Sequence, residues 1–276
     1  MYRGFFINLD RNTKRLSSVS QNLTDIGLAS IYERVPAIDG RTLGAEYVTE
    51  LDRGNLGLWL TQERLIAAHR SSGHHLHIME DDALLPADAK HCLNDMLEKA
   101  DKHLKSWDLI FTDIFLQLEV SCFQLLSEAR KQYLQSGALN YFPLKHLLGF
   151  AGTSSIFINK NSIDKYLKLI SGNWTKGMPI DIYLRQLIKD QSLDAYVTMP
   201  FLTTLSRNTN ESDIQGPLDL SRRILNLYRR AAYKDSNLTE IGEEMRKLTA
   251  GPNVPPYANL FLNAVTFLLS DRYLNF

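Results

Sequence analysis

The chain has 276 residues, 44% of them hydrophobic, and its 31 basic side chains are matched by 31 acidic ones. The hydrophobic fraction is large enough for a sizeable core and argues against an intrinsically disordered chain. Zero net charge argues against a dedicated nucleic-acid-binding protein, because such proteins carry a basic excess that neutralises phosphates. We therefore expect no nucleic acid among the partners.

The N-terminal half alternates between strand-like and helix-like segments. Apolar runs predict strands at residues 4–9, 31–38, 76–79 and 108–112, and apolar positions at helical spacing predict helices at 12–27, 56–70 and 87–103. This alternation is typical of a parallel sheet in an α/β sandwich. Because ligands of such sheets bind beyond the carboxyl ends of the strands, the polar residues at these ends are of interest: Asn8, Asp10, Asp39, Glu80, Asp81, Asp82 and Asp113.

The C-terminal half has a looser pattern. We predict strands at residues 154–159 and 195–199, helices at 114–136, 162–170 and 179–189, and a polar loop at 206–216. Helices dominate from residue 217 onward. Since neither an internal repeat nor a Gly/Ser linker is present, a single domain with a helical C-terminal extension is the simplest organisation.

Neither the cysteines nor the apolar segments indicate a metal site, a disulfide scaffold or a membrane anchor. Cys92 and Cys122 alone cannot form a tetrahedral metal site or a disulfide scaffold. The apolar start of the chain is too short for a signal peptide, and residues 258–269 are interrupted by polar side chains, as in an amphipathic helix. We expect a cytoplasmic protein without a transmembrane anchor.

Three consecutive carboxylates, Glu80, Asp81 and Asp82, follow the third predicted strand. Like charges at one strand end destabilise a fold unless a cation lies beside them. A divalent ion that prefers oxygen ligands, Mn²⁺ or Mg²⁺, would balance them and would commonly bridge to substrate phosphates. A solvated acidic turn or a cap of the next helix is the alternative interpretation.

Other phosphate and metal motifs are missing or incomplete. The sequence contains neither GxGxxG nor GxxxxGK[ST], which argues against a Rossmann dehydrogenase or a P-loop enzyme. His74, His75 and His77 precede the carboxylates, but no cysteine or distant histidine at metal spacing completes a zinc site. We interpret these histidines as residues of a loop and a strand start.

Six short motifs, in chain order, resemble glycosyltransferase family 25, the bacterial lipooligosaccharide glycosyltransferases and their collagen-modifying relatives. They are Ile7-Asn8-Leu9-Asp10 with the basic helix start after it, Arg34-Val35-Pro36-Ala37-Ile38-Asp39-Gly40, Ile78-Met79-Glu80-Asp81-Asp82, Ser155-Ile156-Phe157-Ile158-Asn159-Lys160, Pro179-Ile180-Asp181, and Ser212-Asp213-Ile214. One position departs from the family pattern: the usual Leu-Ser-His before the carboxylates is Leu60-Thr61-Gln62 in this chain.

The resemblance implies a GT-A-like single α/β domain at residues 1–216, with a Rossmann-like nucleotide-binding half, and a helical extension at 217–276 packed on the same domain. It also implies an inverting enzyme that moves a hexose, galactose or glucose, from a UDP-sugar to a bacterial lipooligosaccharide or another surface glycan.

Site residues follow from the resemblance together with their positions at strand ends. Glu80 and Asp82 are expected to bind the metal, which stabilises the leaving diphosphate. The residues expected around the UDP-sugar are Asn8, Leu9 and Asp39 for uracil and ribose, Arg11 and Arg15 for the phosphates, and Asp81 for the metal or ribose. A solvated helix start is the alternative interpretation of the two arginines.

An inverting transfer needs a general base that deprotonates the acceptor hydroxyl. Asp181 is our candidate, because this carboxylate of the Pro-Ile-Asp motif begins a helix after a loop. Asp213 is the alternative, on a loop that would close over the donor or complete the metal shell, and Asp113 is a third option. A helix cap is the structural alternative for either Asp181 or Asp213.

Residues 221–234 contain several basic side chains and no acidic one: Arg222, Arg223, Arg229, Arg230 and Lys234. An apolar stripe beside them predicts a basic amphipathic helix. Such a helix would bind the anionic inner face of the inner membrane, where lipid-linked acceptors lie. An ordinary helix with a solvated basic face is the alternative.

Two further functions stay open. A non-catalytic member of the same fold would bind nucleotide or glycan without turnover, and Gln62 in place of the family histidine keeps this alternative open. A metal-dependent phosphohydrolase would use similar carboxylates, but the motifs around Asn8 and Asp39 do not support it.

Overall fold

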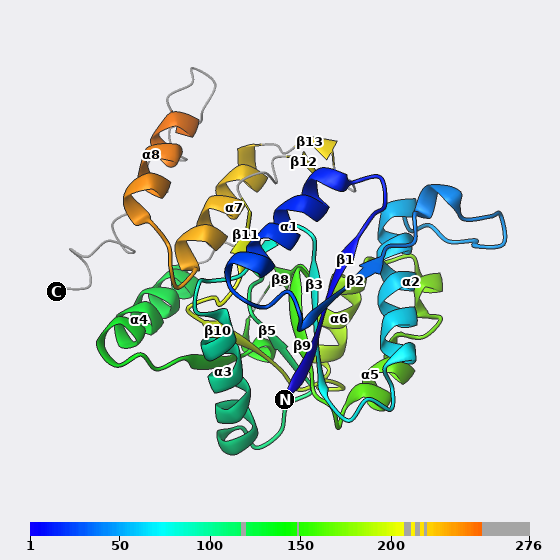
Figure 1. The fold of residues 1–276 in the computed structure, drawn as a ribbon, viewed down its shortest axis with the longest axis horizontal. Coiled ribbons are helices and arrows are strands. Elements are labelled where there is room, and N and C mark those ends of the chain that lie inside the picture. Colours follow the sequence, from blue (N-terminus) through cyan, green and yellow to red (C-terminus); the bar gives the residue numbers. More distant parts are fainter. Residues whose placement is uncertain (117–119, 148, 207–210, 213–215, 218–219, 250–276) are drawn as a thin grey trace.

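A seven-stranded sheet forms the centre of the molecule, with helices on both faces (Figure 1). The computed structural model describes residues 1–116, 120–147, 149–206, 211–212, 216–217 and 220–249. The strands lie in the order β2 (Tyr32–Pro36), β1 (Tyr2–Asn8), β3 (His75–Glu80), β9 (Ser155–Ile158), β5 (Leu109–Phe111), β10 (Ala195–Met199) and β7 (Asn140–Pro143). The protein is therefore an α/β protein, as the alternation of segments predicted.

The helices agree with most of the predicted segments. They are α1 (Thr13–Asp25), α2 (Arg53–Ala68), α3 (Ala89–His103), α4 (Val120–Ser136), α5 (Ile163–Ile170), α6 (Ile180–Lys189), α7 (Leu220–Ala232) and α8 (Leu238–Thr249). Short elements connect them: η1 (Gly40–Thr42), β4 (Ala83–Leu84), β6 (Phe115–Leu116), η2 (Leu144–His146), β8 (Phe150–Ala151), η3 (Asn173–Lys176), β11 (Thr204–Leu205), β12 (Glu211–Ser212) and β13 (Gly216–Pro217). The helix predicted at residues 258–269 lies outside the described residues.

Local sequence explains where α1 begins and ends. The side chain of Asn12 accepts a hydrogen bond from the Arg15 N–H at 3.3 Å, which satisfies one of the free amides at the helix start. At the other end Gly27 has a φ of +68°, and the Leu28 N–H donates to the Leu23 carbonyl at 2.8 Å. A left-handed glycine with this bond is the usual end of a helix, so α1 is defined by its own sequence.

The sheet is mixed, and this corrects the expected parallel arrangement. β1 is parallel to β2 and β3, and β10 is parallel to β5. However, β9 lies between β3 and β5 and is antiparallel to both. The alternation of strand-like and helix-like segments is a local pattern and does not specify which strand fills a gap in the sheet. As a consequence β9 begins at the edge where β3 and β5 end.

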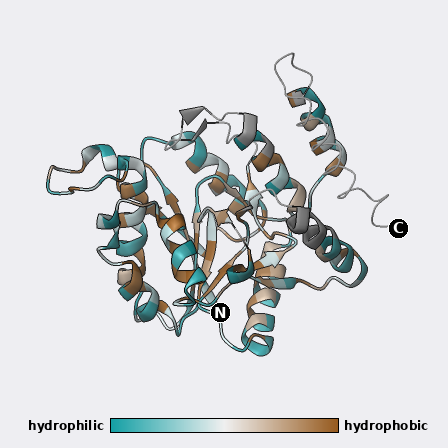
Figure 2. Cartoon of the chain, turned by 180° about the vertical axis from the view of Figure 1, so that it is seen from behind, coloured by the Kyte–Doolittle hydropathy of each residue, from teal (hydrophilic) through white to brown (hydrophobic). Residues whose placement is uncertain are grey.

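Two hydrophobic clusters cover the two faces of the sheet. One joins the strands to α2, α5 and α6, with Leu56, Trp59 and Tyr166 among its fully buried side chains. The other joins them to α1 and α3. Figure 2 shows the central strands as largely hydrophobic and the outer helix surfaces as largely hydrophilic. This layered burial fixes the strand ends, and with them the residues that follow the strands.

The C-terminal helices pack on the same core. Leu227, Tyr228 and Ala231 of α7 are buried in the cluster that contains α2. The Phe201 N–H donates to the Ala232 carbonyl at 2.9 Å, and the Lys234 N–H donates to the Phe201 carbonyl at 2.9 Å. α7 is thus bound to the segment that follows β10. No helix within the described ranges is both long and apolar enough to cross a bilayer.

Candidate functional site at the strand ends

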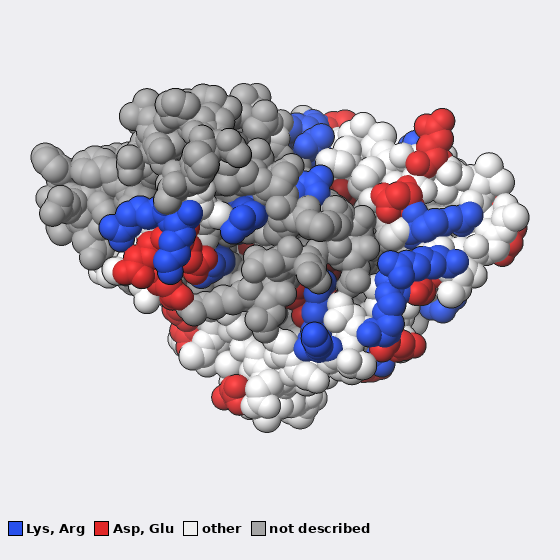
Figure 3. Space-filling model, turned by 90° about the horizontal axis from the view of Figure 1, so that it is seen from above, with Lys and Arg blue, Asp and Glu red and all other residues white. Residues whose placement is uncertain are grey.

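A pocket of about 110 Å³ lies where β1, β2 and β3 end. Its lining combines an apolar wall with charged side chains: Ile7, Leu9, Arg11, Arg15, Ala37, Ile38, Asp39, Gly40, Gly54, Leu58, Glu80, Asp81 and Asp82. Viewed from above, this face of the molecule has basic and acidic side chains lying next to one another (Figure 3). The structure therefore brings most of the residues predicted around the donor and the metal into one place.

The wall that carries Asp39 is pressed against α2, because two glycines allow the close approach. A Cβ on Gly40 would lie 1.6 Å from the carbonyl oxygen of Arg53, and one on Gly57 would lie 2.3 Å from that of Ile38. The Thr61 hydroxyl accepts a hydrogen bond from the Ile38 N–H at 2.8 Å. Residues 37–40 are consequently held in one position against the helix.

Asp81 is bonded on both of its oxygens. The Asn8 side-chain amide donates to one oxygen at 2.7 Å, and Arg15 Nη1 donates to the other at 3.1 Å. Arg34 Nε in turn donates to Asn8 Oδ1 at 3.1 Å, which orients the Asn8 amide. Asn8 does not line the pocket, so the structure places it behind the site, where it positions Asp81.

Two arginines contribute positive charge to the pocket, and both have carboxylate partners. Arg11 pairs with Asp39 across the pocket, with side-chain exposures of 35% and 30%. The Arg41 backbone N–H and the Arg11 guanidinium hold the pKa of Asp39 below its usual value. Arg15 contacts Asp81 and also lies 3.6 Å from Asp82. Because Arg11 is partly in solvent, a bound anion can compete with Asp39 for it.

Glu80 and Asp82 carry the least compensated charge in the site. Burial, reinforced by neighbouring carboxylates, raises the pKa of Glu80 and of Asp82. Glu80 Oε1 accepts a hydrogen bond from the Thr153 hydroxyl at 3.4 Å, whereas Asp82 Oδ1 is buried without a hydrogen-bond partner. These two side chains would gain most from an additional cation or proton.

The fit of a divalent cation to these residues is partial. In the described part of the chain, no group of three or more His, Cys, Asp or Glu side chains is arranged to hold a metal ion. Glu80 and Asp82 are partly buried, and Asp82 Oδ1 has no hydrogen-bond partner. Mg²⁺ commonly binds through one or two protein carboxylates when substrate phosphates complete its shell. The donor set fits a cation shared with a phosphate ligand, and it does not form a closed metal cage.

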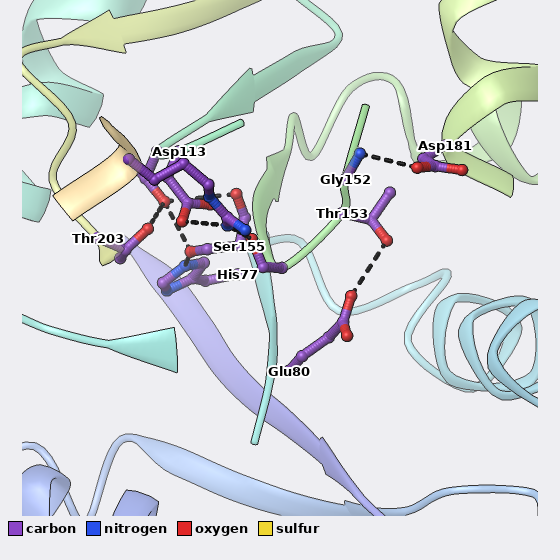
Figure 4. Close-up of polar contacts among 11 residues, drawn as sticks. His77, Glu80, Asp113, Gly152, Thr153, Ser155, Asp181 and Thr203 are labelled. Atoms are coloured by element: carbon purple, nitrogen blue, oxygen red, sulfur yellow. Dashed lines mark hydrogen bonds and ion pairs between the residues drawn. The ribbon is translucent and has the colours of Figure 1, made fainter. Parts of the chain in front are cut away.

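The segment before β9 enters the site, and sequence reasoning did not identify it. Thr153 lies against Glu80, and Asp181 of α6 accepts a hydrogen bond from the Gly152 N–H at 2.8 Å (Figure 4). The second Asp181 oxygen accepts from the Ile182 N–H at 2.8 Å. Asp181 therefore lies at the same edge as Glu80, with both oxygens bonded to backbone amides. Asp213, the alternative candidate for the general base, lies outside the described residues.

Gln62, the residue that departs from the family motif, is fully buried on α2. Its amide nitrogen donates to the Thr153 hydroxyl at 3.4 Å, and its Oε1 has no hydrogen-bond partner. Gln62 is thus linked to Glu80 through a single hydroxyl group. This link places it behind the carboxylates and away from the pocket lining.

Arg229 lies at the same edge of the sheet, although its sequence pattern predicted a position on a basic helix surface. It belongs to the segment 221–234 that we interpreted as a basic surface helix, yet its side chain is 1% exposed and pairs with the fully buried Asp113 at 2.5 Å. Its neighbour Arg230 forms two bonds to Glu244, at 2.6 and 2.9 Å, and Lys234 binds Asp88 at 2.7 Å. Three of the five basic side chains thus have carboxylate partners within the molecule, and Arg229 is buried, not part of a solvated basic face as expected. Membrane contact by this helix stays a prediction.

The histidines before the carboxylates have structural partners. The Lys160 N–H donates to His75 Nδ1 at 3.2 Å. His77 lies between the hydroxyl groups of Tyr32 and Ser155, and its ring stacks on Phe157 at 3.9 Å. Burial lowers the pKa of His77 to about 3, so the ring is neutral at physiological pH.

Comparison with known proteins assigns this chain to no family. No family model matches it, and no curated protein matches it. One solved structure, described as that of a glucose-1-phosphate thymidylyltransferase from Bacillus anthracis in complex with a sucrose, aligns with 84% of this chain and 76% of its own. The identity is 9% and the TM-score is 0.36. This similarity is too low to transfer a fold or a function.

Proposed function

We propose that this protein is a GT-A-type, inverting glycosyltransferase that moves a hexose from a UDP-sugar to a glycan acceptor. The observation that carries the proposal is the pocket at the ends of β1, β2 and β3, where an apolar wall, two arginines and four carboxylates meet. The motifs that resemble glycosyltransferase family 25 contribute most residues of this pocket, which adds support from the sequence.

The chemistry of the lining matches the parts of a nucleoside diphosphate. Leu9, Ala37 and Leu58 offer apolar surface to a flat base, and Asp39 offers oxygen atoms to ribose hydroxyls. Arg11 and Arg15 offer guanidinium groups to the phosphates, to which they bind through paired N–H donors. Asn8 and Arg15 hold the Asp81 carboxylate in a fixed orientation at the floor of the pocket.

Mn²⁺ or Mg²⁺ is the cofactor of the proposal. Glu80 and Asp82 would hold it, and when bound it would offset the negative charge of the leaving diphosphate. The raised pKa values of Glu80 and Asp82 support this assignment, because crowded buried carboxylates are stabilised by a cation. Arg15, which contacts Asp81 and Asp82, supplies part of that compensation from the chain itself.

Asp181 stays our proposal for the general base, with Asp213 as the alternative. Asp181 begins α6 at the edge of the sheet near Glu80, and like-charge repulsion from Asp181 contributes to the raised pKa of Glu80. Deprotonation of the acceptor hydroxyl by a carboxylate would give the nucleophile that displaces the diphosphate with inversion. The acceptor we propose is a bacterial lipooligosaccharide or another surface glycan.

UDP release from a panel of UDP-sugars, with MnCl₂ and a truncated lipooligosaccharide acceptor, tests the proposal. We expect acceptor-dependent release with UDP-galactose or UDP-glucose, and a loss of about 100-fold or more in kcat for Asp82→Ala. Asp10→Asn is the matched control, since Asp10 also follows β1 at this edge but is 77% exposed and absent from the pocket lining.

Three outcomes separate the candidate functions. Turnover that Asp82→Ala abolishes and Asp10→Asn preserves would support the transferase. UDP binding without turnover on any acceptor would instead favour the non-catalytic binding protein, for which the loss of the family histidine at Gln62 is the motivating observation. Absence of both binding and turnover would refute the assignment of the pocket.

A further inference from the structure

Arg229 lies near the carboxylates at this edge of the sheet, but it belongs to α7 and not to the segments that line the pocket. Its side chain contacts Asp113, which follows β5, and Ser154, which precedes β9. A guanidinium that is 1% exposed has lost nearly all of its hydration, so it must be compensated by its neighbours. Those neighbours identify what it does.

Arg229 contacts Asp113, two residues after β5, Ser154, directly before β9, and Phe115, the first residue of β6. Arg229 Nη2 donates to Asp113 Oδ2 at 2.5 Å and to the Ser154 hydroxyl at 2.7 Å. The Ser154 hydroxyl donates to the other Asp113 oxygen at 2.6 Å, which closes a ring of three residues. The guanidinium carbon also lies 4.0 Å from the centre of the Phe115 ring, a cation–π contact.

The ring of Arg229, Asp113 and Ser154 is connected to the pocket carboxylates through the backbone. The Glu80 N–H donates to the Ser154 carbonyl at 2.8 Å, so a shift of Ser154 displaces Glu80. Thr153 precedes Ser154 and carries the hydroxyl that bonds Glu80, and Gly152 carries the amide that bonds Asp181. The carboxylates of two strands and one helix thus depend on one short segment, residues 152–154, and Arg229 holds the end of it.

α7 is itself bonded to the elements around it. The C-terminal end of α7 receives hydrogen bonds from Arg130 of α4, whose Nη1 lies 3.5 Å from the Ala231 carbonyl and 2.6 Å from the Ser236 hydroxyl. Together with the backbone bonds to Phe201, these contacts fix the helix on which Arg229 stands.

We propose that α7 is part of the functional site and that Arg229 is its positioning residue. Its guanidinium neutralises Asp113 and clamps Ser154, and so holds Thr153 and Gly152 against Glu80 and Asp181. The inference goes beyond the residues of the pocket, because Arg229 does not line it. Its consequence for ligand binding rests on the proposed function, whereas its consequence for the geometry of residues 152–154 does not.

A set of variants with a matched control tests the proposal. Arg229→Met removes the cation and retains its bulk, and Asp113→Asn/Arg229→Met also removes the carboxylate that would be left unpaired. Arg230→Met is the control, because it breaks the neighbouring ion pair of the same helix, which binds Glu244 of α8. Amide hydrogen exchange reports on residues 110–114 and 150–156, and calorimetry at saturating MnCl₂ reports on UDP binding.

We expect Arg229→Met to accelerate exchange in those two segments and to weaken UDP binding by about tenfold or more, since a buried negative charge is left beside the carboxylates. The double variant should recover part of the UDP affinity, because it restores the local charge, but its exchange at residues 150–156 should stay accelerated, because the bond from Arg229 to Ser154 is still missing. Arg230→Met should leave both measurements unchanged, although it loses an ion pair.

The readouts separate this inference from the proposed function. Unchanged exchange at residues 150–156 in a folded Arg229→Met protein, or equal changes in Arg230→Met, would refute the positioning role. If Arg229→Met does not fold, exchange is measured in the double variant and in Arg229→Lys, which keeps the charge but loses the fork of donors that bonds Asp113 and Ser154 together. Both should accelerate exchange at residues 150–156, and unchanged exchange in both would refute the positioning role. A wild-type protein that binds no UDP would refute the nucleotide pocket, while the exchange comparison would still decide the role of Arg229.

Discussion

Two arginine–aspartate pairs lie at the same edge of the sheet and differ mainly in their access to water. Arg11 and Asp39 are 35% and 30% exposed at the pocket, whereas Arg229 and Asp113 are 1% and 0% exposed beneath α7. An exposed pair of this kind contributes little to stability, because water and salt screen it. A buried pair cannot lose one member without leaving an uncompensated charge in a medium of low polarisability.

The difference teaches how one kind of ion pair can serve two purposes. The Arg11 guanidinium can leave Asp39 for a bound anion, since both groups are solvated without each other. The Arg229 guanidinium cannot leave Asp113, and it therefore sets the position of the residues around it. The exposed pair at the pocket is therefore suited to binding a ligand, and the buried pair of α7 is suited to holding neighbouring residues in position.

The largest expected effect concerns the buried pair. Replacement of Arg229 by Met should lower the free energy of unfolding by about 3 to 5 kcal/mol, because Asp113 stays buried without its cationic partner. Urea denaturation at pH 7 measures it. The double variant Asp113→Asn/Arg229→Met should be more stable than Arg229→Met alone; if it is less stable, the loss arises from packing and not from charge.

A smaller effect is expected from a buried histidine on the same side of the site. Burial lowers the pKa of His77 from 6.5 to about 3, so below pH 6.5 the unfolded chain binds a proton that the folded chain does not. The stabilising contribution is complete above pH 6.5 and is lost as the pH falls toward 3. Between pH 7 and pH 5 the loss amounts to about 2 kcal/mol.

Comparison with His77→Gln isolates this contribution. Urea denaturation at the two pH values should give a fall in stability that is about 2 kcal/mol larger for the wild type than for His77→Gln. The raised pKa values of Glu80 and Asp82 act in the opposite direction, and they cancel in the comparison because both proteins contain them. His91→Gln, at an exposed position on α3, should behave as the wild type does. If His91→Gln reduced the fall in stability between pH 7 and pH 5 as much as His77→Gln, the assignment to His77 would be wrong.

The smallest effect on stability is expected from the exposed pair. Arg11→Met should change the free energy of unfolding by less than about 1 kcal/mol, since both partners are partly solvated. UDP affinity should nevertheless fall several-fold at low salt and less at high salt, as is usual for a screened phosphate contact. Arg3→Met breaks a similarly exposed pair, Arg3–Glu33, at the start of β1 and should change neither quantity. A stability loss for Arg11→Met as large as that for Arg229→Met would remove the distinction between the two pairs.

The pocket side of the site could be predicted from sequence because its residues follow predicted strands directly. Glu80, Asp81 and Asp82 come at the end of an apolar run, and Arg11 and Arg15 come just after another. The rule that parallel strands end at one edge then places them together. The structure agrees, since all five line one pocket.

The α7 side could not be predicted in this way. Arg229 and Arg230 are adjacent and chemically identical, yet one is buried against Asp113 and the other binds Glu244. The sequence contained one signal: Arg229 lies three residues before the buried Ala232, at the border of the apolar stripe of the helix. That spacing indicates that the side chain can face inward, but it does not identify the carboxylate that makes such burial stable.

The sequence by itself determined the local elements of this protein and the acidic strand end, because hydrophobic periodicity, capping residues and strand-end polarity act between near neighbours. Only the tertiary structure decided that β9 enters the sheet between β3 and β5 in the opposite direction. That insertion brings Thr153 to Glu80 and Ser154 to Arg229. The pairing of β9 with β3 and the compensation of Asp113 by Arg229 join residues more than 70 positions apart, and no local pattern specifies them.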